Sequence, residues 1–299
     1  MKKIDIHVHT RAVKGLTRIG TNSTYATPEE LISMYDRIGV EKGVILPSQC
    51  PESSIRPQSH EDVMQIMGKH SDRFYWFCNV DPRAGNNSPD TDLSYFINYY
   101  KQKGAKGVGE VTANLYFDDP LVLNLFKHAE KCEMPLTFHI AHKKYDCYGL
   151  IDDLGLPRLE KVLSMFPKLK FLAHSQTYWA EISSDVNEET RKGYPTGKVI
   201  PGRVVELMRK YPNLLGDMSA GSGFNAITRD LEFGYSFLEE FNERLFFGTD
   251  ICAPENDKQP FFGFSSWLDE ACASGKISKT AYENICRNNA LRLFGECIS

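Results

Sequence analysis

The segment Ile4-Asp5-Ile6-His7-Val8-His9 opens the chain with a short apolar run that ends in two histidines. Such a run is typical of a buried parallel strand. A helix signal follows, with Thr27 as the N-cap, Pro28 at the first helical position and Glu30 three residues after the cap. The apolar residues of this helix recur on one face, and Gly39 is placed to end it: they are Leu31, Met34, Tyr35 and Ile38.

The same strand-then-helix pattern recurs along the whole chain. We expect the remaining strands at residues 43–46, 74–80, 107–111, 136–139, 169–174, 214–218 and 245–249. We expect the remaining helices at residues 61–69, 93–103, 120–131, 159–165, 204–210, 231–241, 265–273, 278–284 and 288–294. The polar segment 176–198 is expected to be a long loop after the sixth strand.

Eight strands that alternate with helices predict a closed (β/α)₈ TIM-type barrel. The competing architecture is an open doubly wound sheet, but no GxGxxG motif follows the first strand. Neither a linker nor a low-complexity segment interrupts the 299 residues, so we expect a single domain over residues 1–299.

The composition is that of an ordinary globular protein, with 41% hydrophobic and 25% charged residues. A net charge of −4 gives no electrostatic footprint for nucleic acid. There is no stretch of about 18 apolar residues for a membrane span, nor a signal peptide at the start. The eight cysteines are scattered without a CxxC motif, which indicates reduced thiols and a cytoplasmic location.

Polar residues with metal-binding side chains stand at the ends of several expected strands. His7 and His9 are two apart on one strand, so their imidazoles project to the same face. His139, His174 and Asp250 end the fifth, sixth and eighth strands. Because strand ends meet at the C-terminal mouth of a barrel, these five side chains predict a metal site there.

At these residues the sequence resembles the amidohydrolase superfamily, specifically its amidohydrolase-2 (amidohydrolase-related) branch. The resemblance extends over nearly the whole chain, and the matching pieces are Ile4-Asp5-Ile6-His7-Val8-His9-Thr10, Phe138-His139, Ala173-His174, Phe247-Gly248-Thr249-Asp250 and residues 285–294. The resemblance implies a distorted barrel that holds one or two divalent metal ions, usually zinc. It implies that His7, His9 and His139 are metal ligands and that Asp250 contacts the metal and its water. It also implies that His174 binds a second metal or the substrate.

Glu110 ends the fourth expected strand, in Gly107-Val108-Gly109-Glu110-Val111. In binuclear members of the family a carboxylate at this place bridges two metals. Gly-Glu-Val here is also similar to the related deoxyribonuclease-type hydrolases, whose glutamate binds metal. Alternatively, Glu110 forms an ion pair with a nearby lysine, or it orients a ligand histidine without binding metal itself.

Residues in the loops at the barrel mouth are candidates for substrate binding. Arg11, Lys14 and Arg18 follow the two histidines and could clamp an anionic group, and of these Arg11 is our main candidate. His142 and Tyr178 lie in the loops after strands five and six and are expected to contact substrate, and Tyr145, Tyr148 and Trp179 could wall the same pocket. His60, His70 and His128 are expected at the surface.

The expected activity is metal-assisted hydrolysis of an amide, a lactone or another ester in a small molecule. Asp250 would move the proton of the attacking water, and His174 would stabilise the developing oxyanion. The first alternative is a non-oxidative decarboxylase of aromatic acids on the same barrel. The second is a non-catalytic barrel that binds metal. The sequence leaves open whether the chains form a homo-oligomer.

Overall fold

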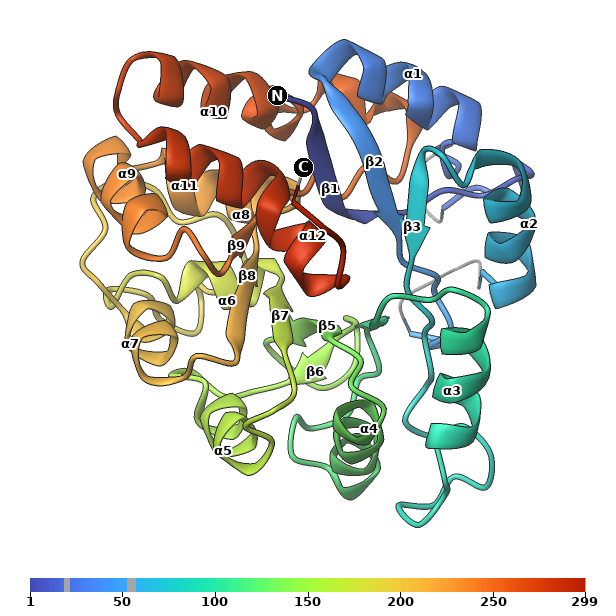
Figure 1. Cartoon of the computed structure of the whole chain (residues 1–299). Helices are drawn as coiled ribbons and strands as arrows, with labels where there is room; N and C mark the ends of the chain where they lie inside the picture. The colour runs from blue at the N-terminus through green and yellow to red at the C-terminus, as the bar shows by residue number, and fades with distance from the viewer. Residues whose placement is uncertain (19–21, 53–57, 299) are drawn as a thin grey trace.

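The computed structural model describes residues 1–18, 22–52 and 58–298. Parallel strands stand in the middle of the molecule and helices surround them (Figure 1). One sheet contains β1 (Lys3–Val8), β2 (Val40–Ile45) and β3 (Phe74–Trp76) in that order. The other contains β4 (Val108–Val111), β5 (Leu136–Ala141), β7 (Phe171–His174), β8 (Leu214–Asp217) and β9 (Leu245–Phe246), with β6 (Leu150–Ile151) paired to β5.

Hydrogen bonds join the two sheets at both of their edges. Next to β3, the Cys78 amide donates to the Gly107 carbonyl over 2.9 Å, and Cys78 and Val108 form a parallel bridge. Next to β9, the Ile6 amide donates to the Phe247 carbonyl over 3.0 Å, and Val8 forms a parallel bridge with Ile251. The strands therefore form a ring, and the α/β barrel predicted from the sequence is confirmed as the fold class.

The first helix begins and ends as its sequence predicts. α1 (Pro28–Ile38) starts at Thr27, whose hydroxyl accepts from the Glu30 amide while the Glu30 carboxylate accepts from the Thr27 amide. Gly39 ends it in the left-handed conformation, with φ of 73°, which costs glycine little.

Most of the other helices lie close to their predicted ranges. They are α2 (His60–His70), α3 (Ser94–Gln102), α4 (Pro120–Lys131), α5 (Pro157–Met165), α7 (Arg203–Lys210), α9 (Leu231–Glu240), α10 (Phe264–Ala273), α11 (Lys279–Glu283) and α12 (Asn289–Leu293). A π-helical turn, Asn284–Asn288, connects the last two. Short 3₁₀ turns at Pro254–Lys258 and Pro260–Gly263 lead from the last strand to α10.

Two helices were not predicted. α6 (Gln176–Ala180) occupies the start of the segment expected to be a loop, and its Thr177, Tyr178, Trp179 and Ala180 are buried. α8 (Ala220–Thr228) follows β8, where the Ala-Gly-Ser-Gly composition favours a turn. Tertiary packing outweighs local propensity in both, since α6 and α8 pack on each other.

Two histidines expected at the surface are buried. His60 is 7% exposed, stacks on Tyr100 with ring centroids 3.7 Å apart, and accepts from the Asn79 amide through Nε2. His128 is 6% exposed on the inner side of α4. The surface prediction was therefore wrong for both: His60 is held by its stacking on Tyr100 and its hydrogen bond with Asn79, and His128 Nδ1 lies 3.3 Å from Asp92 Oδ1.

Buried side chains form two clusters. The larger one lies between the strands and the surrounding helices. The smaller one groups Ile4, Ile6, Val44, Leu172, Leu215 and Phe246 with Ala290, Leu291 and Phe294. α12 thus covers one end of the ring, as Figure 1 illustrates, and the opposite end is left for the polar strand ends. Among the described residues, no helix is long and apolar enough to cross a membrane.

Candidate metal centre

Six polar side chains converge at the C-terminal ends of the strands. His7 lies in β1, Glu110 in β4 and His139 in β5, while His174 is the last residue of β7. His9 follows β1 directly, and Asp250 lies in the turn after β9. His139 and His174 are direct register partners on neighbouring strands. The parallel ring brings these residues to one side of the molecule because every strand ends there.

The two histidines of β1 face each other through their Nε2 atoms, which are 3.1 Å apart. His7 Nδ1 lies 2.6 Å from Asp217 Oδ2, and His9 Nδ1 lies 2.7 Å from the Leu46 carbonyl oxygen. In a neutral imidazole, the ring nitrogen beside an oxygen acceptor carries the proton. With Nδ1 protonated in both rings, the Nε2 lone pairs of His7 and His9 are directed at the same point between them. A proton or a metal ion between the two nitrogens would stabilise this pair. Two ligands of a tetrahedral zinc ion are spaced by about 3.3 Å, which matches.

Glu110 presents its two oxygens to different histidines. Oε2 is 3.7 Å from Nε2 of both His7 and His9, whereas Oε1 is 2.9 Å from Nδ1 of His139. Burial alone would raise the pKa of this carboxyl group. The hydrogen bond from His139 and the charge of His7 outweigh that effect and hold the pKa well below its usual range. Glu110 is therefore an anion placed between two groups of histidines.

Asp250 lies on the other side of the β1 histidines. Its Oδ1 is 3.7 Å from His7 Nε2 and 3.5 Å from His9 Nε2, and its Oδ2 is 3.9 Å from His174 Nε2. The backbone of Asp250 is in the left-handed region with φ of 55°, a conformation that costs a non-glycine residue about 1–3 kcal/mol. Burial raises the pKa of this carboxyl group to about 7. The turn after β9 thus directs a carboxylate at the cluster at a cost in backbone energy.

Asp217, the last residue of β8, approaches two of the histidines, His7 and His174, on their Nδ1 sides. Its Oδ2 is 2.6 Å from His7 Nδ1 and 3.6 Å from His174 Nδ1, and the Ser219 hydroxyl lies 3.0 Å from the same His174 atom. Burial would raise the pKa of Asp217, but the charges of His7 and His174 hold it below its ordinary value. Burial would lower the pKa of the His7 imidazole, but the negative charge of Asp217 and its hydrogen bond outweigh burial, and the pKa is raised to about 10.

Two overlapping groups of these side chains could each hold a metal ion. One contains His7, His9 and Asp250, and the other contains His7, Glu110 and His174. Within each group all the ligand atoms lie within 4.8 Å of one another. Imidazole nitrogens with carboxylate oxygens suit zinc and other divalent transition metals. His139 belongs to neither group and approaches the cluster through Glu110.

The cluster lines a cavity of about 80 Å³. Its walls are formed by His9, Arg18, Tyr25, Ser48, Glu110, His139, Tyr148, His174, Asp250 and Cys252. Tyr148 packs on His139 with ring centroids 4.6 Å apart, and the ring centroids of Tyr25 and His9 are 6.3 Å apart. The donor set is thus open to a small molecule on one side, unlike a structural metal site closed by four protein ligands.

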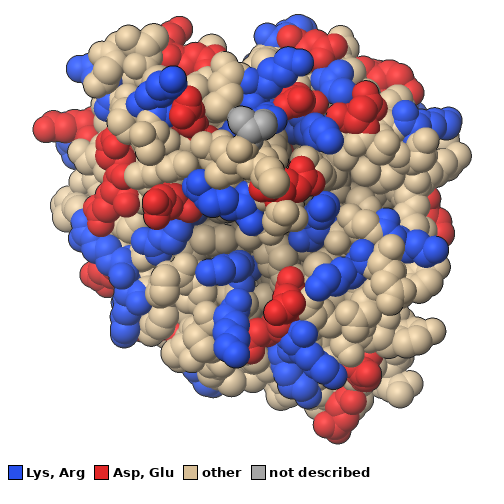
Figure 2. Space-filling model, viewed as in Figure 1, with Lys and Arg blue, Asp and Glu red and all other residues tan. Residues whose placement is uncertain are grey.

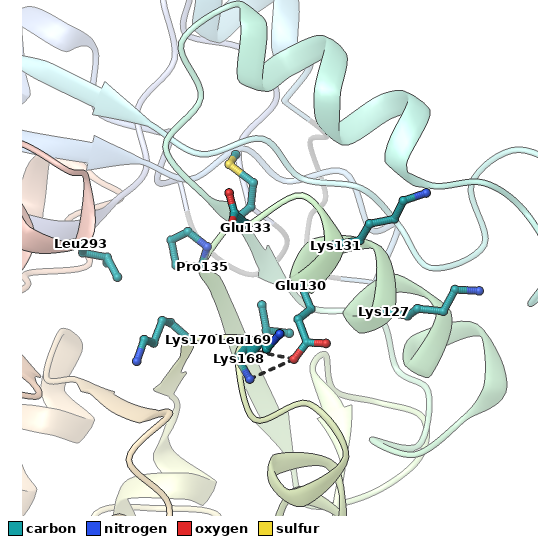
Figure 3. Close-up of a pocket in the computed structure, with 10 residues that line it drawn as sticks. Lys127, Glu130, Lys131, Glu133, Pro135, Lys168, Leu169, Lys170 and Leu293 are labelled. Atoms are coloured by element: carbon teal, nitrogen blue, oxygen red, sulfur yellow. Dashed lines mark hydrogen bonds between the residues drawn. The ribbon is translucent and has the colours of Figure 1, made fainter.

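A larger cavity of about 650 Å³ lies away from this cluster (Figure 3). It is lined by Met134 and Pro135, which precede β5, by residues 168–170, which precede β7, and by the end of α4. Glu130 in its wall accepts from the backbone amides of Lys168 and Leu169. This cavity is at the beginnings of the strands, so it lies on the face of a barrel that seldom carries chemistry.

The three residues predicted to bind substrate do not line the site cavity. Tyr178 is fully buried in the hydrophobic core beside Trp179, because it belongs to α6 and not to a loop. Arg11 and His142 are half-buried, outside the walls of the cavity. Arg18 and Tyr148, the other candidates named from the sequence, do line it.

The sequence prediction missed Asp217, Tyr25, Ser48 and Cys252. The signal for Asp217 was present, since it ends the apolar run Leu214-Leu215-Gly216 in the same way that the other ligands end theirs. No comparable signal marks Tyr25, Ser48 or Cys252, which reach the cavity through the paths of loops.

Known structures resemble this chain over almost its full length. An uncharacterised TIM-barrel protein from Bordetella bronchiseptica has 17% identity and a TM-score of 0.63, with 99% of each chain covered. The chain has the fold of the TIM-barrel proteins. A probable 2-pyrone-4,6-dicarboxylic acid hydrolase from Acinetobacter baumannii has 15% identity, covers 99% of this chain and 100% of its own, and has a TM-score of 0.57.

A third similar structure is a dihydroxybenzoic acid decarboxylase from a Polaromonas species, with bound manganese. It has 16% identity and a TM-score of 0.58, with 98% of this chain and 97% of the other covered. Neither a protein-family model nor a curated protein sequence matches the chain. At these identities the comparison shows a shared fold, which agrees with the amidohydrolase-2 resemblance inferred from the sequence, and the names of the neighbours include a hydrolase and decarboxylases.

Proposed function

We propose that this protein is a metal-dependent hydrolase that cleaves an amide, a lactone or another ester in a small molecule. The observation that carries the proposal is the placement of Glu110, with one oxygen toward His7 and His9 and the other toward His139. Two divalent ions held close together repel each other, so a site for two ions needs an anion between them. Glu110 is that anion in our proposal.

The proposed ligands divide into two sets that share Glu110. His7, His9 and Asp250 would hold the first ion, and His139 and His174 would hold the second. We expect zinc, in one or two equivalents per chain, because imidazole and carboxylate ligands suit it. When bound, such an ion supplies Lewis acidity, which lowers the pKa of water and polarises a carbonyl oxygen.

The chain itself would supply proton transfer and orientation. Asp250 would accept the proton of the attacking water through a carboxylate oxygen and pass it to the leaving group. His174, with Nδ1 held by Ser219 and Asp217, would stabilise the developing oxyanion if it does not bind the second ion. The adjoining cavity favours catalysis over a non-catalytic metal site, since a purely structural ion needs no such space.

A decarboxylase of aromatic acids is the second candidate, and His139 is the residue that favours it. The 2.9 Å approach of His139 Nδ1 to Glu110 Oε1 also fits a simple hydrogen bond. Glu110 would then orient His139 instead of bridging, and the site would hold one ion. Several structures with the same fold are decarboxylases.

The net charge of −4 supports a small-molecule substrate over nucleic acid. Figure 2 agrees, since basic and acidic side chains are interspersed over the face it presents. A cytoplasmic location and the absence of a membrane partner remain predictions from the sequence, and so does the option of a homo-oligomer.

Metal analysis of the purified protein, together with a screen of lactones, amides and aromatic acids, tests the proposal. We expect about two equivalents of metal, falling to one or fewer in Glu110→Gln, and hydrolysis by the wild type. The matched control is Glu160→Gln, which changes a carboxylate paired with Arg203 and Lys210 outside the site. Asp250→Asn should lower turnover by about 10²–10⁴-fold, and its metal content should fall by a smaller factor than its turnover.

Other outcomes of the same experiment favour the alternatives. One equivalent of metal with carbon dioxide release would support the decarboxylase. Bound metal without turnover of any compound would support the non-catalytic barrel. Full metal content in Glu110→Gln would contradict the bridging role.

A further inference from the structure

Among the described residues that line the cavity of the candidate metal centre, Arg18 is the only arginine or lysine. It follows β1 in the loop that also carries Arg11 and Lys14. Lys14 is turned outward and pairs with Glu30 at the start of α1, and Arg11 is outside the walls of the cavity. Of the three cations that follow the histidine pair, only Arg18 is therefore placed to meet a bound molecule.

Local contacts fix the direction of the Arg18 side chain. Its guanidinium lies over the Tyr25 ring, 5.4 Å from the centroid, and its backbone amide donates to the Ser23 carbonyl over 3.0 Å. The guanidinium also contacts the Cys252 thiol, which lines the same cavity. Tyr25 and Cys252 thus hold the group at the cavity with its plane defined, as bidentate binding of a carboxylate requires.

The charge of Arg18 has no ion-pair partner in the part of the chain that the structure describes. Its neighbours are an aromatic ring and a thiol, and Asp250 acts on it only at longer range. A half-buried guanidinium gains most from a carboxylate because that group accepts two parallel hydrogen bonds. The same cavity is thus lined by the candidate metal ligands and by this cation.

The size of the cavity limits the molecule that can reach both sides. It measures about 80 Å³, while pockets for drug-sized ligands measure about 300–1,000 Å³. Tyr148 over His139 and Tyr25 near His9 close the flanks. A cavity of this size favours a short chain over a substituted aromatic ring beside the candidate metal ligands.

We propose that Arg18 binds a carboxylate at the far end of a compact substrate whose other end reaches the metal ligands. This inference rests on the proposed function, because it assumes that the reacting end of the substrate lies at the histidine cluster. It specifies the substrate class as a short molecule with one anionic group remote from the reacting bond, and it makes Arg18 the residue that determines this specificity.

Calorimetric titration of the zinc-loaded protein with succinate and with succinamate, its half-amide, tests the assignment. The two probes have nearly the same size and differ in one negative charge. We expect the wild type to bind succinate about 10- to 100-fold more tightly, in line with a charge-assisted hydrogen bond. Arg18→Met should reduce that preference to about threefold or less, and Arg18→Lys should keep part of it because lysine retains the charge.

Lys14→Met is the matched control, since it removes one positive charge from the same loop away from the cavity, and it should keep the wild-type preference. The assignment is overturned if Arg18→Met retains the preference, if the wild type has none, or if the wild type does not bind succinate. Metal content is measured on every variant. A protein that holds no metal but prefers succinate through Arg18 would refute the proposed hydrolase and leave the carboxylate anchor standing.

Discussion

At the scale of single residues, the site depends on groups that fix the histidines as much as on the histidines themselves. Asp217 has no exposure to solvent and meets His7 Nδ1 over 2.6 Å. This contact sets the tautomer that leaves His7 Nε2 open for a metal. Asp5, also fully buried, accepts from the His7 amide over 3.0 Å and from the Tyr35 hydroxyl over 2.7 Å, so it holds the backbone of the same residue.

The variant Asp217→Asn tests this support. The amide keeps the shape but can present its nitrogen to His7 and so disfavour the required tautomer. We expect zinc affinity to fall by about 10- to 100-fold, as for other partners of metal-binding histidines. Competition with a fluorescent chelator measures it.

Asp152→Asn is the control for Asp217→Asn. Asp152 is a buried aspartate that caps α5 through the amides of Arg158 and Leu159. Its loss should lower stability and leave zinc affinity unchanged. Equal losses of affinity in the two variants would contradict a specific role for Asp217.

His60 gives a second prediction for a single residue. Burial lowers the pKa of this imidazole to about 4, from an ordinary value near 6.5. Between these values the unfolded chain binds a proton that the folded chain does not, so stability falls as the pH falls through this window. No stability is lost above about pH 6.5, and at pH 5 the loss of unfolding free energy from His60 amounts to about 2 kcal/mol.

Urea unfolding of wild type and His60→Gln at pH 7.5 and pH 5 measures the contribution of His60. Both proteins carry the same metal ligands, so the titration of those ligands cancels in the comparison. We expect the loss of unfolding free energy between the two pH values to be smaller in the variant. An identical loss in both proteins would show that His60 does not titrate as its burial implies.

At the scale of elements, caps and strand ends were predictable and the helices at the barrel mouth were not. The capping box of α1 is a local pattern, and so are the apolar runs that end in His139 and His174. α8 begins Ala220-Gly221-Ser222-Gly223, and Gly223 is required because an added Cβ would lie 2.2 Å from the Met218 carbonyl oxygen. Its helix forms through packing on α6 and α9, which no local pattern reveals.

The site shows the same division. The converging ligands follow from strand ends and barrel geometry, so His7, Glu110, His139, His174 and Asp250 were all identifiable from the sequence. The walls of the cavity depend on how loops fold back. Tyr178 was expected in a long loop but lies in the core, whereas Cys252 lines the cavity although no sequence signal marked it.

The variant Thr27→Ala tests the capping box of α1. It removes the hydroxyl that accepts from the Glu30 amide and should cost about 1 kcal/mol of unfolding free energy. Ser33→Ala, on the exposed face of the same helix, is the control and should be neutral or slightly stabilising. Chemical denaturation measures both. A Thr27→Ala protein as stable as Ser33→Ala would mean that the box does not stabilise the helix.

At the scale of the whole molecule, the metal centre connects parts of the chain that are far apart in sequence. Its side chains come from β1, β4, β5 and β7 and from the turn after β9, so they span both sheets. The seam between β1 and the β9 end is closed by few hydrogen bonds, among them Asp250 amide to His7 carbonyl over 2.8 Å. A bound ion held by His7, His9 and Asp250 would cross that seam and stabilise the closed ring.

Metal binding should therefore raise the unfolding temperature of the entire protein. A ligand that binds only the folded state at 100 times its Kd adds about 2.7 kcal/mol, which corresponds to a rise of several degrees for a chain of this size. We expect the melting temperature to fall when a chelator is added and to recover with zinc. His7→Ala combined with His9→Ala removes both β1 ligands, so this variant should bind no metal tightly and melt at the same temperature with or without chelator. If the double variant responded to chelator and zinc as the wild type does, the metal would lie elsewhere in the molecule.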